Sequence, residues 1–290
     1  MIIAKIQGGL GNQMFQYAFG RVLALRNHTE LKLDATMFEG YIHRYTMDHL
    51  NIKDIYATPA EISSFTRYRT HNTRLGRWLL NPLFADKKRY VIEPAFTFVP
   101  EMLNLKEPCM VDGYWQSEKY FLEIENLLRK EFTLREPLGK YSQEIAAKIS
   151  STEHPVFLHI RRGDFAHHPT YSKIHGVCPP EYYEAAKGII KEKVGSPTYF
   201  VFSDDIDWAR ENIKTDFPTE YIGQGPDKNY EDMELMRLCE HRILANSTFG
   251  WWGAWLSDTY RTGITIAPKQ WNIKLNTKDL LPTHWTVLPF

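Results

Sequence analysis

The second half of the chain alternates short apolar runs with amphipathic stretches, and this alternation constrains the fold more than any other feature of the sequence. Runs of strand length occur at 156–160, 199–202, 220–222, 242–245 and 265–267. Helical patterns separate them at 180–193, 206–213 and 230–241, and another helix is expected after Thr248. Repeated alternation of this kind predicts a doubly wound α/β domain with a parallel sheet.

The N-terminal part opens in the same way. Residues 1–6 form an apolar run, a glycine turn follows at Gly8–Gly11, and apolar residues recur with helical period from Met14 to Leu25. A second short apolar run ends at Asp34. We therefore expect a β-α-β unit and a second parallel sheet.

The middle of the chain gives less regular signals. No period can be assigned from residue 40 to residue 110, whereas Ser117 is expected to cap a helix that reaches Leu128. The polar run 150–155 then breaks the pattern before the next strand. We place a domain boundary there and predict two domains, 1–150 and 151–290, which face one another across a cleft.

Charge and cysteine content exclude several classes of function. Lys plus Arg and Asp plus Glu both total 35, which argues against a broad charged surface for nucleic acid or anionic lipid, so any anion site must be local. The cysteines are three, widely spaced and without metal-ligand spacing, which favours buried thiols in a reducing compartment. No signal peptide or apolar stretch of membrane-spanning length is present. These features predict a cytoplasmic, bacterial enzyme; peripheral membrane attachment and oligomeric state stay open.

The first motif that could carry chemistry runs from His159 through Arg161, Arg162 and Gly163 to Asp164, where a buried strand gives way to a loop. Two adjacent guanidinium groups are costly to bury without an anion, because each keeps its charge. A diphosphate is the natural anion, since arginine's planar fork matches phosphate oxygens and glycine lets a loop approach a ligand. Internal salt bridges, for example with Asp164, explain the same residues equally well.

An acidic motif follows the next strand, at Ser203, Asp204, Asp205 and Asp207. These residues suit the cap of the following helix, which is the interpretation that the local sequence favours. One carboxylate could instead accept hydrogen bonds from the paired donors of guanine. A divalent metal on Asp205 and Asp207 is the weakest interpretation, because no third ligand is evident.

The third motif begins with Asn246, Ser247 and Thr248 and passes through Phe249 and Gly250 into an aromatic helix. Backbone N–H groups and hydroxyls at a helix N-terminus make an anion site. Ordinary capping followed by tryptophan packing explains the same residues and is preferred locally. The first motif shifts the balance toward an anion site, because cations and a helix dipole then meet at strand ends of one domain.

The glycine turn near the N-terminus suggests a rival function. Gly8–Gly11 resembles a dinucleotide fingerprint, and Asp34 stands where a ribose-binding acid is expected, which would indicate a nicotinamide-dependent oxidoreductase. Met14 occupies the place of the third glycine, so a simple tight turn is the plainer interpretation. The aromatic content of 14% leaves a non-catalytic sugar-binding protein as a second rival, but such a protein has no use for Arg161 and Arg162.

Together these motifs resemble the bacterial α-1,2-fucosyltransferases of glycosyltransferase family eleven. The resemblance spans most of the chain, and His-x-Arg-Arg-x-Asp is its most specific part. Its blocks are Gly8–Phe15, Gly113–Glu118, His159–Asp164, Phe202–Asp205 and Asn246–Trp255. The resemblance implies a GT-B-like fold of two Rossmann-like domains, GDP-β-L-fucose as donor, the 2-hydroxyl of a terminal galactose as acceptor, inversion, and no metal or other cofactor.

The resemblance also implies roles for individual residues. The domain 1–150 would bind the acceptor and 151–290 the GDP-fucose. Arg161 or Arg162 would hold the β-phosphate, assisted by the turn Asn246–Gly250. The other expected donor-side residues are His159, Asp204, Asp205, Gly9 and Asn12, and the expected acceptor-side residues are Trp115 and Gln116.

The chemistry of glycosyl transfer fits the two arginines independently of the resemblance. Cleavage of the sugar–phosphate bond develops negative charge on the departing nucleotide, which fixed positive groups stabilise. The base that removes the acceptor proton is not identified by the sequence. Its candidates are Asp164, His167, His168 and an acid of the N-terminal domain.

Overall fold

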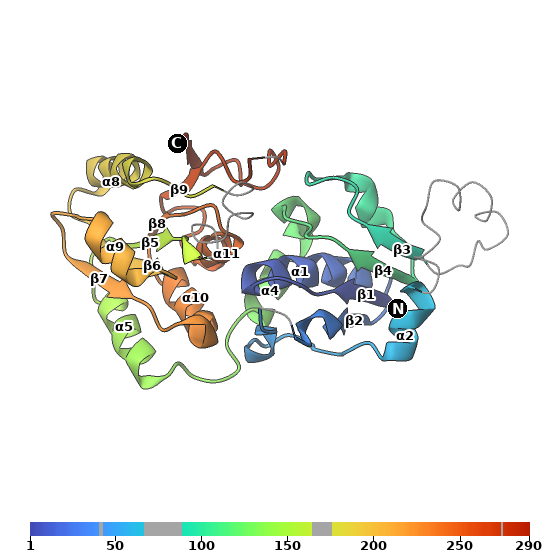
Figure 1. Ribbon diagram of the computed structural model, residues 1–290. Helices are drawn as coiled ribbons and strands as arrows, with labels where there is room; N and C mark the ends of the chain where they lie inside the picture. The colour runs from blue at the N-terminus through green and yellow to red at the C-terminus, as the bar shows by residue number, and fades with distance from the viewer. Residues whose placement is uncertain (41–42, 67–88, 164–175, 274) are drawn as a thin grey trace. The chain divides into compact units, whose positions relative to one another are not determined.

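The computed structural model describes residues 1–40, 43–66, 89–163, 176–273 and 275–290. The chain divides into two compact units, unit 1 from Met1 to Phe132 and unit 2 from Thr133 to Phe290 (Figure 1). This division comes before the boundary expected near residue 150. The reason is that helix α5 (Lys140–Ser150) packs against helix α10 (Asn229–Arg237) of unit 2.

Unit 1 contains a parallel sheet of four strands in the order β2-β1-β4-β3. The strands are β1 (Ile2–Lys5), β2 (Leu31–Asp34), β3 (Arg89–Ile92) and β4 (Cys109–Asp112). Helix α1 (Leu10–Arg26) joins β1 to β2, which confirms the predicted β-α-β unit. Helix α2 (Pro59–Thr66), β3 and β4 lie where the sequence has no clear period.

The helix predicted from Ser117 to Leu128 is wrong in its first half. Two 3₁₀ turns, η5 (Glu118–Tyr120) and η6 (Leu122–Ile124), precede helix α4 (Glu125–Glu131), and Ser117 is the N-cap residue of η5 without a side-chain cap hydrogen bond to it. Tyr120 and Phe121 are both almost fully buried. Neighbouring side chains on an α-helix point about 100° apart, so a break at Phe121, where φ is −135°, lets both enter the core.

Unit 2 contains a parallel sheet of six strands in the order β10-β9-β8-β5-β6-β7. The strands are β5 (Pro155–Ile160), β6 (Thr198–Ser203), β7 (Thr219–Ile222), β8 (His241–Ile243), β9 (Thr265–Pro268) and β10 (Thr286–Leu288). The chain starts at the central β5, adds β6 and β7 on one side, and then adds β8, β9 and β10 on the other. This is the doubly wound order, in which ligands bind at the point where the direction of winding reverses.

The helices of unit 2 follow the predicted alternation. Among the residues that the structure describes, they are α8 (Pro180–Val194), α9 (Ile206–Asn212), α10 and α11 (Thr248–Leu256), together with α5 before the sheet (Figure 1). One face of β5, formed by Val156, Leu158 and Ile160, packs in a core with buried residues of α8 and α9. Burial on both faces explains why β5 reads as a continuous apolar run.

Four further 3₁₀ turns occur in the described part of the chain: η1 (Thr36–Phe38), η2 (Met47–His49), η4 (Pro100–Asn104) and η7 (Pro226–Lys228). Cys109, Cys178 and Cys239 are buried free thiols, as predicted. Over the part of the chain that the structure describes, no helix has the length and apolar character that crossing a bilayer requires.

Candidate functional site

The winding of the unit 2 sheet reverses between β5 and β8, and three of the predicted motifs leave the sheet at this edge. The register places Ile160 of β5 beside Ser203 of β6, and Leu158 of β5 beside Ile243 of β8. The loops that follow these strands therefore begin as neighbours along one carboxyl edge. They carry Arg161, Arg162, Asp204, Asp205, Asn246 and Ser247.

Arg161 follows β5 and forms an ion pair with Asp204. Its Nη1 lies 2.8 Å from Asp204 Oδ2, and the two side chains are 28% and 26% exposed. The other oxygen, Asp204 Oδ1, accepts a hydrogen bond from the backbone N–H of Arg162 at 2.8 Å. A Cβ at Gly163 would lie 2.4 Å from Asp204 Oδ2, so only glycine leaves room for this carboxylate. An internal salt bridge is therefore present, and the described partner is Asp204.

Arg162 is held from two sides. Its Nε lies 3.3 Å from Asp205 Oδ2, and its Cζ lies 3.8 Å from the centroid of the Trp208 ring. Asp205 Oδ1 accepts a hydrogen bond from the backbone N–H of Trp208 at 3.3 Å and caps α9, which confirms the predicted helix cap. Both oxygens of Asp205 therefore have partners within the protein.

His159 lies next to the end of β5, is 5% exposed and packs against the start of α11. Its ring centroid is 5.8 Å from that of Phe249, and a Cβ at Gly250 would lie 2.5 Å from His159 Nδ1. Burial, and then the nearby charge of Arg161, lowers the pKa of His159 to about 3. The ring is therefore neutral near pH 7 and adds no third positive charge to the arginines.

The turn after β8 is fixed by hydrogen bonds within the protein. Ser247 Oγ accepts from the Phe249 N–H at 3.3 Å and caps α11, as the sequence predicts. Asn246 is buried, and its Nδ2 donates to the carbonyl of Gly176 at 3.3 Å. The predicted tryptophan packing is also confirmed, since Trp251, Trp252 and Trp255 are fully buried. The tryptophans anchor α11, and its N-terminus starts at the carboxyl edge of the sheet.

The sheet of unit 1 has a corresponding edge between β1 and β4. Gly8 has a φ of +80°, and Gly9 is the N-cap residue of α1. Gln116 Nε2 donates a hydrogen bond to Asn12 Oδ1 at 2.8 Å. The structure therefore joins the expected donor-side turn and the expected acceptor-side segment through this bond.

Trp115 does not have the exposed ring that an acceptor-stacking role needs. Its side chain is 1% exposed, and its ring stacks on Phe19 with centroids 4.0 Å apart. The backbone N–H groups of Tyr114 and Trp115 donate to the carboxylate of Glu93 at 2.7 and 3.1 Å, which fixes the turn. Trp115 is thus a core residue in unit 1, which corrects the prediction; the ring of Tyr114 is exposed instead.

Some predicted residues lie outside the described part of the chain, and one residue of the site was missed. Asp164, His167 and His168, candidates for the catalytic base, fall in the segment 164–175, which is outside the described residues. Trp208 was not predicted. Its signal in the sequence is an aromatic residue three positions after a helix-capping Asp at a strand end.

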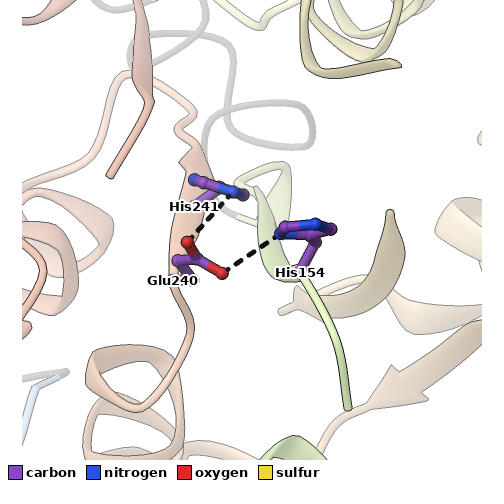
Figure 2. Close-up of side chains that lie close together, drawn as sticks. All are labelled: His154, Glu240 and His241. Carbon is purple, nitrogen blue, oxygen red and sulfur yellow. Dashed lines mark hydrogen bonds and ion pairs between the residues drawn. The ribbon is translucent and has the colours of Figure 1, made fainter. Parts of the chain in front are cut away.

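A second polar cluster lies at the opposite, amino edge of the unit 2 sheet, where His154 and His241 flank Glu240 (Figure 2). His154 Nδ1 is 3.4 Å from Glu240 Oε2, and His241 Nε2 is 3.7 Å from Glu240 Oε1. These side chains suit a metal ion in kind. However, His241 Nδ1 accepts a hydrogen bond from the backbone N–H of Ile264 at 3.1 Å. The neutral ring then carries its proton on Nε2, where a metal would need a lone pair.

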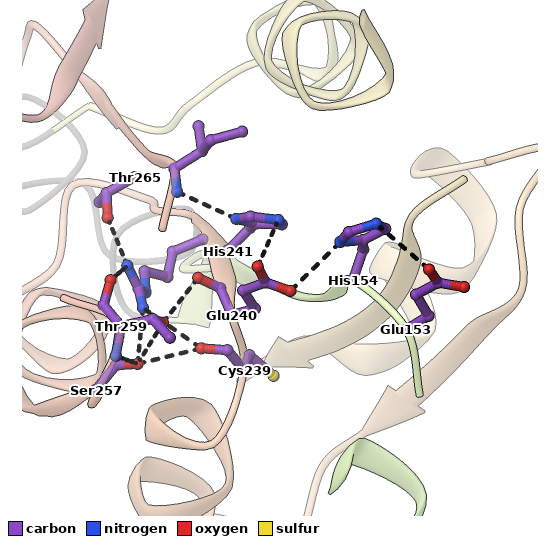
Figure 3. A network of polar contacts seen from close by, with 10 residues as sticks. Glu153, His154, Cys239, Glu240, His241, Ser257, Thr259 and Thr265 are labelled. Atoms are coloured by element: carbon purple, nitrogen blue, oxygen red, sulfur yellow. Dashed lines mark hydrogen bonds and ion pairs between the residues drawn. The ribbon is translucent and has the colours of Figure 1, made fainter. Parts of the chain in front are cut away.

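The cluster continues into a network that joins β8, β9 and the segment after α11 (Figure 3). Arg242 is fully buried, and its guanidinium donates to Thr265 Oγ1 at 3.2 Å and to Ser257 Oγ at 2.7 Å. Ser257 Oγ in turn donates to the carbonyl of Cys239 at 3.2 Å. These bonds engage both terminal nitrogens of a buried cation and tie β8 to β9 and to the segment after α11, which is a structural role.

Comparison with known proteins identifies the family. The model of glycosyl transferase family 11 matches residues 1–287. The chain therefore belongs to glycosyltransferase family 11 and is a glycosyltransferase. An alpha-1,2-colitosyltransferase from Escherichia coli is 33% identical to it, with 98% of both chains covered. Galactoside alpha-(1,2)-fucosyltransferase 2 from Hylobates lar is 27% identical, with 86% of this chain and 67% of the relative covered.

A solved structure shows the same fold. The NodZ alpha-1,6-fucosyltransferase co-crystallized with GDP matches with a TM-score of 0.51 at 15% identity, covering 88% of this chain and 92% of NodZ. At 15% identity this similarity supports an assignment of the fold alone. Together with the two parallel α/β units, it confirms the predicted GT-B-like fold.

Proposed function

We propose that this glycosyltransferase transfers L-fucose from GDP-β-L-fucose to the 2-hydroxyl of a terminal galactose, with inversion and without a metal. The observation that carries the proposal is that the segment with Arg161 and Arg162 and the N-terminus of α11 follow the adjacent strands β5 and β8, between which the winding of the unit 2 sheet reverses. A diphosphate placed there would receive charge-assisted hydrogen bonds and the favourable end of a helix dipole. Unit 2 is thus the donor-binding unit, and unit 1 is proposed to bind the acceptor.

The ion pairs with Asp204 and Asp205 fit this role. A carboxylate that holds a guanidinium fixes its position before the ligand arrives, which reduces the cost of ordering the site on binding. Both pairs are partly exposed, so they are screened and weak enough for a phosphate to share or replace the carboxylate of Arg161. We expect Arg161 to contact the β-phosphate, and we expect Arg162 to serve the diphosphate with its terminal nitrogens while its Nε stays bonded to Asp205.

The reaction that follows is an in-line displacement. The 2-hydroxyl oxygen of galactose bonds to the anomeric carbon of fucose, and the bond from that carbon to the β-phosphate oxygen breaks. The hydroxyl proton leaves to a base, for which Asp164, His167, His168 or an acid of unit 1 remain candidates. The arginines stabilise the negative charge that develops on GDP.

Colitose is a second candidate sugar, because the relative at 33% identity is named a colitosyltransferase. Colitose is L-fucose without its 3-hydroxyl, so the same phosphate site would serve both donors. Discrimination between them would depend on a polar group that hydrogen-bonds this hydroxyl.

One assay tests the function. Purified protein is incubated with GDP-fucose or GDP-colitose and with lactose, N-acetyllactosamine or the type-one disaccharide, and the products are identified by mass spectrometry and linkage analysis. Formation of an α-1,2-fucosyl product supports the proposal. Exclusive use of GDP-colitose would replace the donor, and the absence of transfer together with no calorimetric binding of GDP would refute the nucleotide site. Binding of reduced nicotinamide nucleotide in place of GDP would support the alternative function, a nicotinamide-dependent oxidoreductase.

A further inference from the structure

Trp208 has no role in the proposed reaction as described above, but its side chain lies against Arg162, which does have one. The Arg162 guanidinium carbon lies 3.8 Å from the centroid of its ring, a separation typical of parallel stacking. The indole also packs against the buried core cluster between the sheet and α8 and α9. The indole therefore contacts both the core and the Arg162 guanidinium.

Asp205 joins Arg162 and Trp208 in a closed arrangement of three residues. Asp205 accepts from the Arg162 side chain through Oδ2 and from the Trp208 backbone through Oδ1. The carboxylate restrains the edge of the guanidinium near Nε, and the indole restrains its plane. A guanidinium restrained in both ways has few orientations left, which is the condition for fixed hydrogen-bond donors at a phosphate.

We propose that Trp208 is a positioning residue that sets the plane of the Arg162 guanidinium for the diphosphate of the donor. This inference rests on the proposed function, because it assumes that Arg162 serves the nucleotide. Trp208 itself makes no contact with the substrate in this proposal. Its effect on GDP binding and on transfer must therefore pass through Arg162.

The chain offers a matched control on the same helix. Arg210 of α9 lies over the ring of Tyr221, with its Cζ 4.9 Å from the ring centroid, and Tyr221 also packs against the same core cluster. Tyr221→Leu therefore removes an aromatic platform and core area of similar kind without touching Arg162. A loss caused only by reduced stability would appear in this variant too.

The test is a double-mutant cycle measured by GDP calorimetry and by donor kinetics. Trp208→Leu is expected to weaken GDP binding about fivefold and to raise the donor KM, while Trp208→Phe, which keeps a ring, stays within about twofold of wild type. In the Arg162→Ala background, Trp208→Leu should change the GDP affinity by less than about twofold. The KM for the acceptor should not change in Trp208→Leu. Tyr221→Leu should bind GDP with the affinity of the wild type and keep its donor KM.

The outcomes separate this inference from the function. Equal losses for Trp208→Leu with and without Arg162, or an affinity like wild type for Trp208→Leu, would overturn the positioning role even if transfer from GDP-fucose is intact. A wild-type protein that transfers no sugar from GDP-fucose contradicts the proposed function instead. If Trp208→Leu does not fold, the cycle is run with Trp208→His. A loss of GDP affinity for Trp208→His that is equally large in the Arg162→Ala background, or no loss at all, would overturn the positioning role.

Discussion

Asp204 bonds to both arginines of the site at once: Oδ2 lies 2.8 Å from Arg161 Nη1, and Oδ1 lies 2.8 Å from the backbone nitrogen of Arg162. One carboxylate thus fixes the charge of the first arginine and the backbone of the second. Carboxylates of the protein itself therefore hold and partly neutralise the cations of the site. Binding of a diphosphate would compete with Asp204 for Arg161.

Replacing either arginine should remove most activity. A charge-assisted hydrogen bond contributes about 1.5–3 kcal/mol, and each ~1.4 kcal/mol is tenfold in rate. We expect Arg161→Ala and Arg162→Ala to lose at least about a hundredfold in kcat/KM for GDP-fucose. Arg210→Ala on α9 is the control and should keep its activity. Folded arginine variants that transfer fucose at near wild-type rates would contradict the leaving-group role.

Removing the charge of Asp204 should strengthen nucleotide binding. Asp204→Asn keeps an oxygen for the Arg162 N–H but removes the carboxylate that competes for Arg161. Partly exposed ion pairs contribute about 0.2–1 kcal/mol, so the gain in GDP affinity should be no more than about fivefold. Calorimetry measures it at low and high salt. Weaker GDP binding would show instead that Asp204 contacts the nucleoside or is needed to orient Arg161.

A methyl group at residue 250 should not fit. In Gly250→Ala the new Cβ would lie 2.5 Å from His159 Nδ1 and 3.0 Å from its Cγ, and the ring is buried beside Phe249. Overpacking of this kind costs about 1–3 kcal/mol, which a lowered melting temperature reports. Gly188→Ala on α8 is the control, because its Cβ meets nothing within 4 Å and the helix gains from alanine. Equal melting temperatures for both variants would refute the clash.

The buried His159 should make stability depend on pH. Its pKa is about 3 in the folded protein and about 6.5 when unfolded, so between these values the unfolded chain binds more protons. The contribution of His159 to the free energy of unfolding is fully present above pH 6.5. As the pH falls from 6.5 toward 3, this contribution decreases by about 1.4 kcal/mol per pH unit. Denaturant unfolding of wild type and His159→Gln from pH 7 to pH 5 measures the difference in slope. Identical slopes would mean that the ring is hydrated in the folded state.

Activity should survive removal of divalent metal. The phosphate charge is proposed to be met by arginines and a helix N-terminus, and both oxygens of Asp205 already have protein partners. Transfer rates after dialysis against EDTA should therefore match those with added manganese. Full loss with EDTA and recovery with manganese would restore Asp205 and Asp207 as metal ligands.

The sequence by itself determined the fold class and much of the candidate site. Apolar periodicity located β5, β6, β7 and α8, because a buried parallel strand must be apolar on both faces. Arg161 and Arg162 were found because a strand that ends in two charges is costly without a partner. Asp205 and Ser247 were recognised as helix caps from local preference alone.

Only the tertiary structure decided which partners these residues have. The β5–β6 register brings Asp204 to Arg161, and Trp208 lies against Arg162 although the two are 46 positions apart. Trp115 was misjudged because a tryptophan in a turn can face solvent or the core, and its stacking on Phe19 settles the matter. Periodicity encodes burial along one segment, whereas contacts between segments depend on strand order, which a local pattern does not contain.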